Sequence, residues 1–166
     1  MRGLRITAIV SASLALVLAL FVGYLFHTAQ VRVTAVTAKG VSASTEPTTF
    51  ENLKQAVEED TFTGTMFHKP TEWRDMEDYV LMDYTLQVQN DCLVSIDMLQ
   101  VQVSPLSEDV LQVGDFAVHS LDMKSSGEVT VRILTTKEAH PVRDLILTYY
   151  VWGVGLTTRA TYGSDS

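Results

Sequence analysis

Four histidines and one cysteine are the side chains of this sequence best suited to metal binding or nucleophilic chemistry: His27, His68, His119, His140 and Cys92. The histidines lie far apart, and no pair has the short His-x₃-His spacing that places two imidazoles on one metal ion. A single cysteine cannot form an intramolecular disulfide or a cysteine-based zinc or iron–sulfur site. We therefore expect surface histidines and a buried, inert thiol, with an intermolecular disulfide as the alternative for the thiol.

The segment RDMED, residues 74–78, offers three carboxylates as possible Ca²⁺ ligands: Asp75, Glu77 and Asp78. It lacks the ordered spacing and the glycine of a calcium loop, which favours a solvated turn. The sequence also contains no Gly-x-Ser-x-Gly motif and no glycine-rich phosphate loop. We therefore predict no catalytic, metal-binding or cofactor-binding residue, and a hydrolase or metal-dependent enzyme is the least favoured function.

Three aromatic residues are candidates for binding a partner: Trp73, Tyr150 and Trp152. Trp73 is expected in a loop, where an exposed tryptophan can anchor a ligand, although packing over the end of a sandwich is commoner. Alternation along a strand sends Tyr150 and Trp152 to one face and Tyr149 and Val151 to the other. One pair is expected in the core. The other pair either covers a neighbouring strand, which is the commoner role, or forms an aromatic platform for a glycan or a protein.

An uncharged apolar stretch near the N-terminus is the longest element in the sequence. Residues 6–26 would form a helix of about 31 Å, which matches the hydrocarbon core of a bilayer. A secretory signal has an apolar core of only about 7–15 residues, followed closely by a cleavage site between small residues. A cut after Ala29 would place His27 at the −3 position, and Ala38 lies too far beyond the helix. We predict an uncleaved transmembrane helix in contact with the lipid bilayer.

The flanking charges predict the orientation of this helix. Arg2 and Arg5 precede it, and cytoplasmic flanks are usually the positive ones, although Arg32 and Lys39 argue mildly the other way. Residues 1–5 are therefore expected in the cytoplasm, residues 27–38 as a stalk that becomes the first strand, and residues 39–166 as an extracytoplasmic domain. The helix contains no Gly-x-x-x-Gly motif, which favours a plain lipid-facing anchor over a specific helix–helix contact.

The domain beyond the helix is acidic. Residues 32–166 contain ten Lys and Arg against twenty Asp and Glu, a net charge of −10. Such a domain repels nucleic acid and anionic lipid headgroups, so nucleic acid is excluded as a partner. Neither Asn52 nor Asn90 begins an Asn-x-Ser/Thr sequon, which fits a bacterial protein.

Alternating apolar residues predict most of the secondary structure. In residues 80–89 every even-numbered position is apolar and four of the five odd positions are polar, which predicts a strand with its even face on a core and its odd face in water. Further strands are predicted within 31–40, 61–67, 97–105, 107–120, 125–134 and 145–153, with an edge strand in 154–166. Residues 48–60 instead predict a short helix, which begins with a capping box from Thr48 to Glu51 and places Phe50, Leu53 and Val57 on one face.

These elements predict a mainly β protein. About seven or eight strands separated by turn signals at roughly 8–16-residue intervals favour an antiparallel Ig-like β-sandwich with one short inserted helix, and a small barrel is the alternative. From Tyr79 to Trp152 the sequence resembles the small Ig-like sandwich of late-embryogenesis-abundant group-2 (water-stress-response type) domains, of which bacterial membrane-anchored versions exist. The matching features are YTLQVQN ending in Asn90, LQVQVSP ending in Pro105, GEVTVRIL and the long final strand. The resemblance implies no catalytic residues.

Three functions are consistent with these features. The leading hypothesis is a single-pass membrane-anchored protein with a non-enzymatic binding or structural role at the cell envelope, where it contacts a protein partner or an envelope component. The alternative is an accessory subunit of a membrane complex, such as a transporter or division assembly, whose helix also makes specific contacts. An enzyme is the third. Replacing the helix with an unrelated one separates the first two, because only the accessory subunit should lose its partner.

Overall fold

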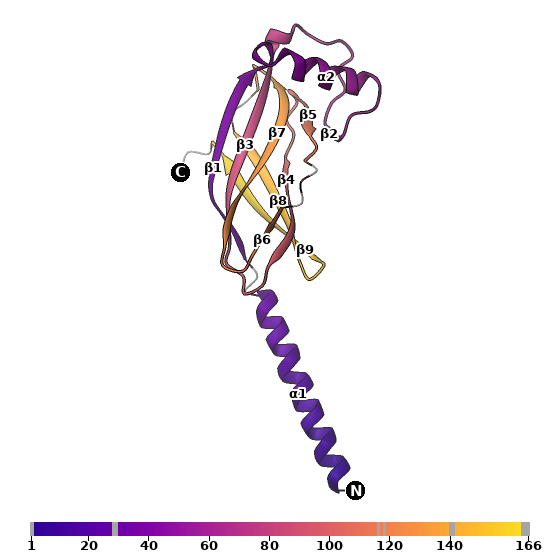
Figure 1. Cartoon of the computed structure of the whole chain (residues 1–166), viewed down its shortest axis with the longest axis vertical. Coiled ribbons are helices and arrows are strands. Elements are labelled where there is room, and N and C mark those ends of the chain that lie inside the picture. The colour runs from indigo at the N-terminus through magenta and orange to yellow at the C-terminus, as the bar shows by residue number, and fades with distance from the viewer. Residues whose placement is uncertain (1, 28–29, 116, 118, 140–141, 164–166) are drawn as a thin grey trace.

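The computed structural model describes residues 2–27, 30–115, 117, 119–139 and 142–163. Two antiparallel sheets form a β-sandwich, a long helix projects from one end of it, and a short helix covers the other end (Figure 1). The predicted sandwich with one inserted helix is therefore confirmed, and the barrel alternative is not. The prediction for His140 falls outside the described residues. The elements are α1 (Arg2–His27), β1 (Val31–Ser42), a 3₁₀ turn (Ala43–Thr45), α2 (Pro47–Glu58), β2 (Gly64–Met66), a 3₁₀ turn (Met76–Asp78), β3 (Tyr79–Asn90), β4 (Ile96–Val103), β5 (Asp109–Val113), β6 (His119–Leu121), β7 (Ser126–Thr136), β8 (Arg143–Val151) and β9 (Val154–Tyr162).

The two sheets leave one edge strand of each on the same side of the sandwich. The first sheet has the order β1-β3-β7-β5-β2, and the second has the order β6-β4-β8-β9. β1 pairs with β3 and β9 pairs with β8, so β1 and β9 each keep one unpaired edge. The side chain of Thr158 on β9 donates a 3.3 Å hydrogen bond to the carbonyl of Val31 on β1, which joins the two edges near α1.

The main core lies between the sheets and follows the predicted alternation. Tyr84, Leu86 and Val88 of β3 are buried there, as the even positions of residues 80–89 were expected to be. They pack with inward residues of β4, β7 and β8, which are Leu99, Val101, Val103, Val129, Val131, Ile133, Leu145, Leu147, Tyr149 and Val151. Burial of these side chains supplies the largest favourable contribution to folding, because each removes apolar surface from water.

A second core on the outer face of the first sheet corrects the expected water-facing side of β3. Tyr79 and Leu81, at odd positions, are buried together with Leu134. Phe50 and Val57 of α2 cover them, as expected from the apolar face of that helix, and Leu53 is half-buried beside them. Both faces of β3 are therefore covered near α2, whereas only one is covered near α1.

The start of α2 differs from the predicted capping box. The helix begins at Pro47, whose fixed φ suits the first helical position, and the residue before it, Glu46, makes no side-chain capping bond. Thr48 lies inside the first turn and does not cap the helix. Proline suits this position because the first amides of a helix have no intrahelical acceptor, so its missing N–H removes no helical hydrogen bond.

Irregularities in β1 and β2 depart from the regular strands predicted within 31–40 and 61–67. The pairing of β1 with β3 shifts register between Val33 and Ala35, so Ala35 is exposed and Val36 and Ala38 turn inward. A bulge of this kind reverses the face of every later residue. The strand expected over 61–67 is reduced to three residues. At its start, Gly64 has a φ of +146°, and a side chain there would meet the carbonyl of Gln112 at 2.2 Å.

The β8–β9 hairpin corrects the expected shared face of Tyr150 and Trp152. Val151 pairs with Val154, which leaves Trp152 and Gly153 as a two-residue turn with φ angles of +50° and +79°. Positive φ at both turn positions matches the twist of the flanking strands. Trp152 therefore leaves the strand, and its side chain is 56% exposed at the tip of the hairpin.

Candidate functional site

The end of α1 is built into the sandwich. Leu25 is buried, and Phe26 is half-buried and packs against the main core. The ring of Phe26 meets the ring of Trp152 edge-on, with centroids 5.5 Å apart. Edge-to-face contacts of this kind add to the gain from area burial. The last turn of α1 and the β8–β9 turn therefore form one junction.

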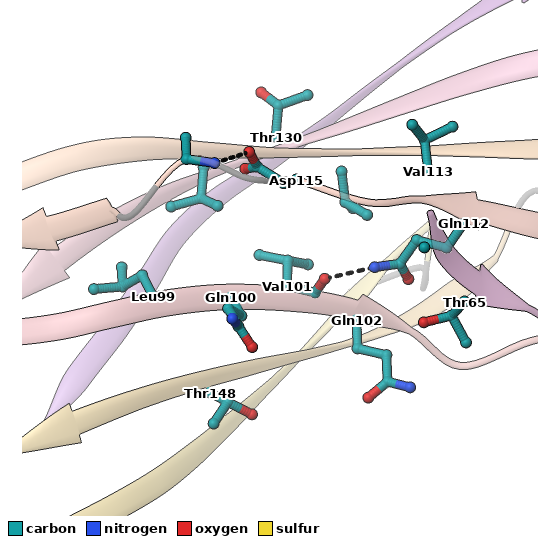
Figure 2. Close-up of a pocket in the computed structure, with 14 residues that line it drawn as sticks. Thr65, Leu99, Gln100, Val101, Gln102, Gln112, Val113, Asp115, Thr130 and Thr148 are labelled. Atoms are coloured by element: carbon teal, nitrogen blue, oxygen red, sulfur yellow. Dashed lines mark hydrogen bonds between the residues drawn. The ribbon is translucent and has the colours of Figure 1, made fainter. Parts of the chain in front are cut away.

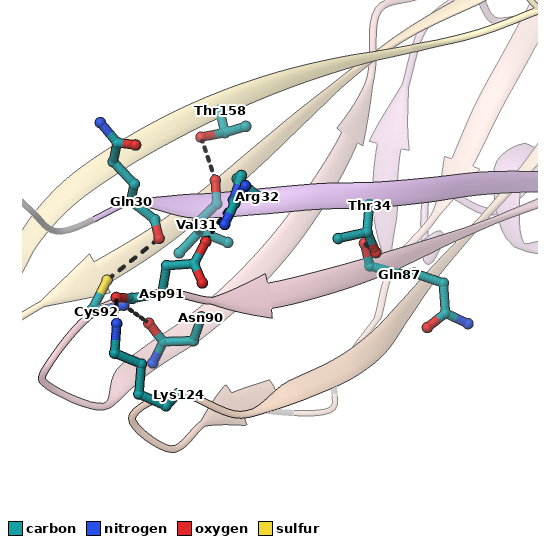
Figure 3. A network of polar contacts seen from close by, with 10 residues as sticks. All are labelled: Gln30, Val31, Arg32, Thr34, Gln87, Asn90, Asp91, Cys92, Lys124 and Thr158. Carbon is teal, nitrogen blue, oxygen red and sulfur yellow. Dashed lines mark hydrogen bonds and ion pairs between the residues drawn. The ribbon is translucent and has the colours of Figure 1, made fainter.

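Polar contacts extend this junction to two further turns (Figure 3). The backbone N–H of Asp91 donates to the carbonyl of Gln30 at 3.2 Å, and Lys124 donates to the carbonyl of Asp91 at 2.5 Å. Arg32 Nε donates to Asp91 Oδ2 at 2.5 Å. The first residues of β1 are thus bound to the β3–β4 turn, which is bound in turn to the β6–β7 turn.

Asn90 holds the same turns together from inside. Its side chain is fully buried and donates to the carbonyls of Val94, Leu121 and Asp122 at 3.0, 3.2 and 2.8 Å. Its Oδ1 accepts the backbone N–H of Cys92 at 2.9 Å. Sequence reasoning missed this role. The available signal was an asparagine at the end of a strand, a residue that commonly bonds to nearby backbone in turns.

The ion pair at the junction shifts both of its pKa values. The hydrogen bond from Arg32 lowers the pKa of Asp91, and the same bond raises the pKa of Arg32. A carboxylate with a lowered folded-state pKa stabilises the fold above its unfolded pKa, and that stabilisation is lost as the pH falls through the folded value. Acid should therefore loosen this contact between β1 and the β3–β4 turn.

Arg32→Ala is expected to raise the pKa of Asp91 towards its ordinary value, because the largest cause of the lowering is removed. An NMR titration of the Asp91 carboxyl measures the shift. Arg159→Ala removes another arginine, on β9, and should leave the pKa of Asp91 unchanged. Equal Asp91 titrations in the parent and in Arg32→Ala would contradict the ion pair.

Cys92 lies inside the junction and is buried, as predicted for an inert thiol. Its Sγ lies 3.7 Å from the carbonyl of Gln30. Burial raises the pKa of the thiol, which lowers the fraction of reactive thiolate.

A polar cleft lies between β4 and the β2–β5 edge of the first sheet (Figure 2). It has a volume of about 310 Å³, and its polar lining includes Thr65, Gln100, Gln102, Asp115, Thr130 and Thr148. Asp115 accepts hydrogen bonds from the N–H of Ala117 at 2.8 Å and from His119 Nε2 at 2.7 Å, and these bonds lower its pKa. Amides and hydroxyls dominate, so the cleft can hydrogen-bond a small polar group.

Gln112 closes one end of this cleft and pairs with the open edge of β4. Its Nε2 donates to the carbonyl of Val101 and its Oε1 accepts the N–H of Val103, both at 2.9 Å. The side-chain amide therefore acts as a neighbouring strand would.

Gln112→Leu is expected to lower the free energy of unfolding by about 1–3 kcal/mol, because two backbone groups of β4 lose their partner. Equilibrium denaturation of the full chain measures the loss. Gln102→Leu, on the exposed face of β4, serves as the control and should have little effect. A Gln112→Leu variant as stable as this control would contradict the role of the amide.

The unpaired edges of β1 and β9 border a groove. It is lined by residues 31–36 and 158–163 and has a volume of about 600 Å³. The two strands carry three basic residues, Arg32, Lys39 and Arg159, and no acidic residue. This is an unusual composition in a domain with a net charge of −10.

Comparison with known proteins assigns no family. Neither the protein-family models nor the curated proteins give a match to this chain. The similarity to late-embryogenesis-abundant group-2 domains stays a prediction.

The three aromatic candidates lie in different places. Trp73 is half-buried near α2, with its ring centroid 5.8 Å from those of both Phe50 and Tyr79. Trp152 lies at the opposite end, beside α1, and Tyr150 lies on β8 against Gly155 of β9. The structure therefore does not bring Trp73 together with the other two.

The possible metal ligands are also dispersed. Among the described residues, no group of three or more His, Cys, Asp or Glu is placed to hold a metal ion. His27 and His68 are exposed, and His119 is half-buried beside Asp115. Glu77 and Asp78 lie on the exposed 3₁₀ turn before β3, immediately after Asp75.

Proposed function

We propose that this chain is a single-pass membrane protein that holds a β-sandwich outside the cytoplasm, where the sandwich binds a protein partner or an envelope component. The observation that carries the proposal is α1. Ile6–His27 is long and apolar enough to span a bilayer, and its large apolar side chains from Ile6 to Val22 are 36% to 69% exposed. Water disfavours such a surface, whereas the hydrocarbon core of a membrane accommodates it.

Arg2 and Arg5 support the proposed orientation, because positive residues before the first helix tend to stay in the cytoplasm. Protease added to sealed right-side-out vesicles should then digest the sandwich, and protease added to inverted vesicles should not. Replacing both arginines with glutamine should allow part of the protein to insert the other way. A domain digested only in inverted vesicles would contradict the orientation.

The groove between β1 and β9 supports binding of an extended segment. Unpaired strand edges offer rows of backbone donors and acceptors to an added strand, a common form of peptide recognition. Arg159, which lines the groove, and Lys39, further along β1, favour an acidic segment, whereas Arg32 is already paired with Asp91. The partner we propose is therefore a protein with an exposed acidic strand.

Site-specific photocrosslinking tests this part of the proposal. A photoreactive residue at exposed Ala35, which lines the groove, should form a crosslinked product that Arg159→Glu diminishes. The same residue at exposed Glu51, on α2, is the control and should not. Replacing residues 6–26 with an unrelated transmembrane helix should preserve the product. Loss of the product after that replacement would favour the accessory subunit instead.

A further inference from the structure

Exposed apolar side chains gather at the end of the sandwich that carries α1. Leu93, Met123, Trp152 and Val154, here called the apolar base, are 50%, 60%, 56% and 47% exposed. They come from the β3–β4 turn, the β6–β7 turn and the β8–β9 hairpin, which all lie beside the end of α1 (Figure 1). The three turns are held there by the contacts of Asp91 with Gln30 and Lys124, and by that of Trp152 with Phe26.

The connection to α1 keeps the apolar base close to the membrane. Only two residues separate His27, at the end of the proposed span, from Gln30, which bonds to the β3–β4 turn. Three Cα–Cα steps cover at most about 11 Å. The headgroup layer on each side of a bilayer is roughly 5–8 Å thick. In addition, Leu25 is buried and Phe26 packs on the core, so the helix provides no spacer.

The charges of the domain are distributed so that this end can approach a membrane. The turns of the base and the start of β1 contain Arg32 and Lys124 against Asp91 and Asp122, with no net charge. Residues 43–78, at the opposite end, contain nine acidic and three basic residues. The repulsion expected between this acidic domain and anionic headgroups therefore originates mainly far from α1, where a short screening length weakens it.

Exposed aromatic residues also lie where α1 meets the sandwich. Trp152 and Tyr24 are 56% and 57% exposed on either side of the half-buried Phe26. Tryptophan and tyrosine are enriched where a protein crosses the boundary between hydrocarbon and water, because their rings are apolar and their N–H and O–H groups can reach water.

We propose that the apolar base rests in the interfacial layer of the bilayer that α1 spans, so that membrane lipid is the ligand of this surface. The inference depends on the membrane anchoring proposed above. Contact at three turns fixes the tilt of the sandwich, which a single flexible tether would leave free. The α2 end is then held away from the membrane.

The two tryptophans of the chain lie at opposite ends and provide the probe. The full chain is reconstituted in phosphatidylcholine vesicles containing a lipid with a nitroxide headgroup, which quenches nearby indole fluorescence. Trp73→Phe leaves Trp152 as the only tryptophan, and Trp152→Phe leaves Trp73. Two further variants lack both natural tryptophans. In the first, Met123→Trp places a probe on a second turn of the apolar base. In the second, Leu106→Trp places the matched control probe at the far end.

Trp152 and Met123→Trp should be quenched several-fold more strongly than Trp73 and Leu106→Trp. Thermal melts equal to that of the parent establish that each variant is folded. Vesicle flotation after an alkaline wash reports anchoring separately. If the chain floats but Met123→Trp is quenched no more than Leu106→Trp, the proposed contact of the apolar base with lipid is wrong, whereas membrane anchoring by α1 is supported. If the chain does not float, the anchor fails and the inference fails with it.

Discussion

Leu86→Asp is expected to leave the sandwich unfolded. Leu86 has no exposed surface, and it lies opposite Val129 in the core between the sheets. An unpaired carboxylate in that position loses its hydration and gains no partner, which costs several kcal/mol. The stability of a whole domain is only about 5–15 kcal/mol. Val101→Asp, on the facing sheet, should act in the same direction.

Near-ultraviolet circular dichroism and limited proteolysis of the full chain measure the loss of packing. The matched control is Gln102→Asp, which adds the same charge to the exposed face of the strand that carries Val101. It should fold as the parent does. If Leu86→Asp and Val101→Asp both melted like the parent, the face assigned to the core would be wrong.

The second large loss of stability is expected when either residue of the Arg143–Asp109 ion pair is replaced. Arg143 and Asp109 are 2% and 1% exposed, and Arg143 Nη2 lies 3.0 Å from Asp109 Oδ1. The other carboxylate oxygen accepts the N–H of Leu106 at 2.8 Å, so the pair also fixes the turn before β5. Asp109→Leu or Arg143→Met should lower the free energy of unfolding by about 3–5 kcal/mol, because each removes the ionic partner of a buried charge.

A double-mutant cycle separates this effect from lost packing. Arg143→Met combined with Asp109→Leu removes both charges and should be more stable than either single variant, since buried ion pairs are often replaceable by apolar residues. Additive losses in the double variant would show that the pair has no energetic coupling. Lys69 and Asp60 form an exposed pair 3.0 Å apart, and Lys69→Met, the control, should cost less than about 1 kcal/mol.

The sequence patterns predicted the sandwich because its signals are local. The alternation over residues 80–89 identified the inward face of β3, and the uncharged run from Ile6 identified α1 by length and composition alone. Neither inference needed knowledge of distant contacts. The edge strand predicted within 154–166 is present as β9.

The misjudged features depend on contacts between segments far apart in the sequence. Leu81 was expected on the water-facing side because the alternation of one strand cannot reveal that α2 returns to cover its other face. The bulge after Val33 is set by pairing with β3, and no local signal announces it. Pro47 and Thr48 are both residue types that favour the start of a helix, and the prediction chose Thr48 where the helix begins at Pro47.

The candidate site was less predictable than the fold. Trp152 was predicted to be an aromatic residue within a strand. Its position depends instead on a hairpin turn and on contact with the ring of Phe26, which is distant in sequence. Asn90 offered only the signal of an asparagine at the end of a strand, and Arg143 offered none, although each is buried and bonded across several segments. Polar residues of this kind are identified by their partners, which become visible only once the chain is folded.

The mass of the mature chain tests the central claim most directly. An uncleaved anchor predicts that the protein recovered from the membrane fraction contains residues 1–166 with the mass of the whole 18.4 kDa chain. A shorter chain in the aqueous fraction, beginning near Gln30 or Lys39, would show that α1 is a signal that is removed. It would contradict the anchor and the lipid-resting base together.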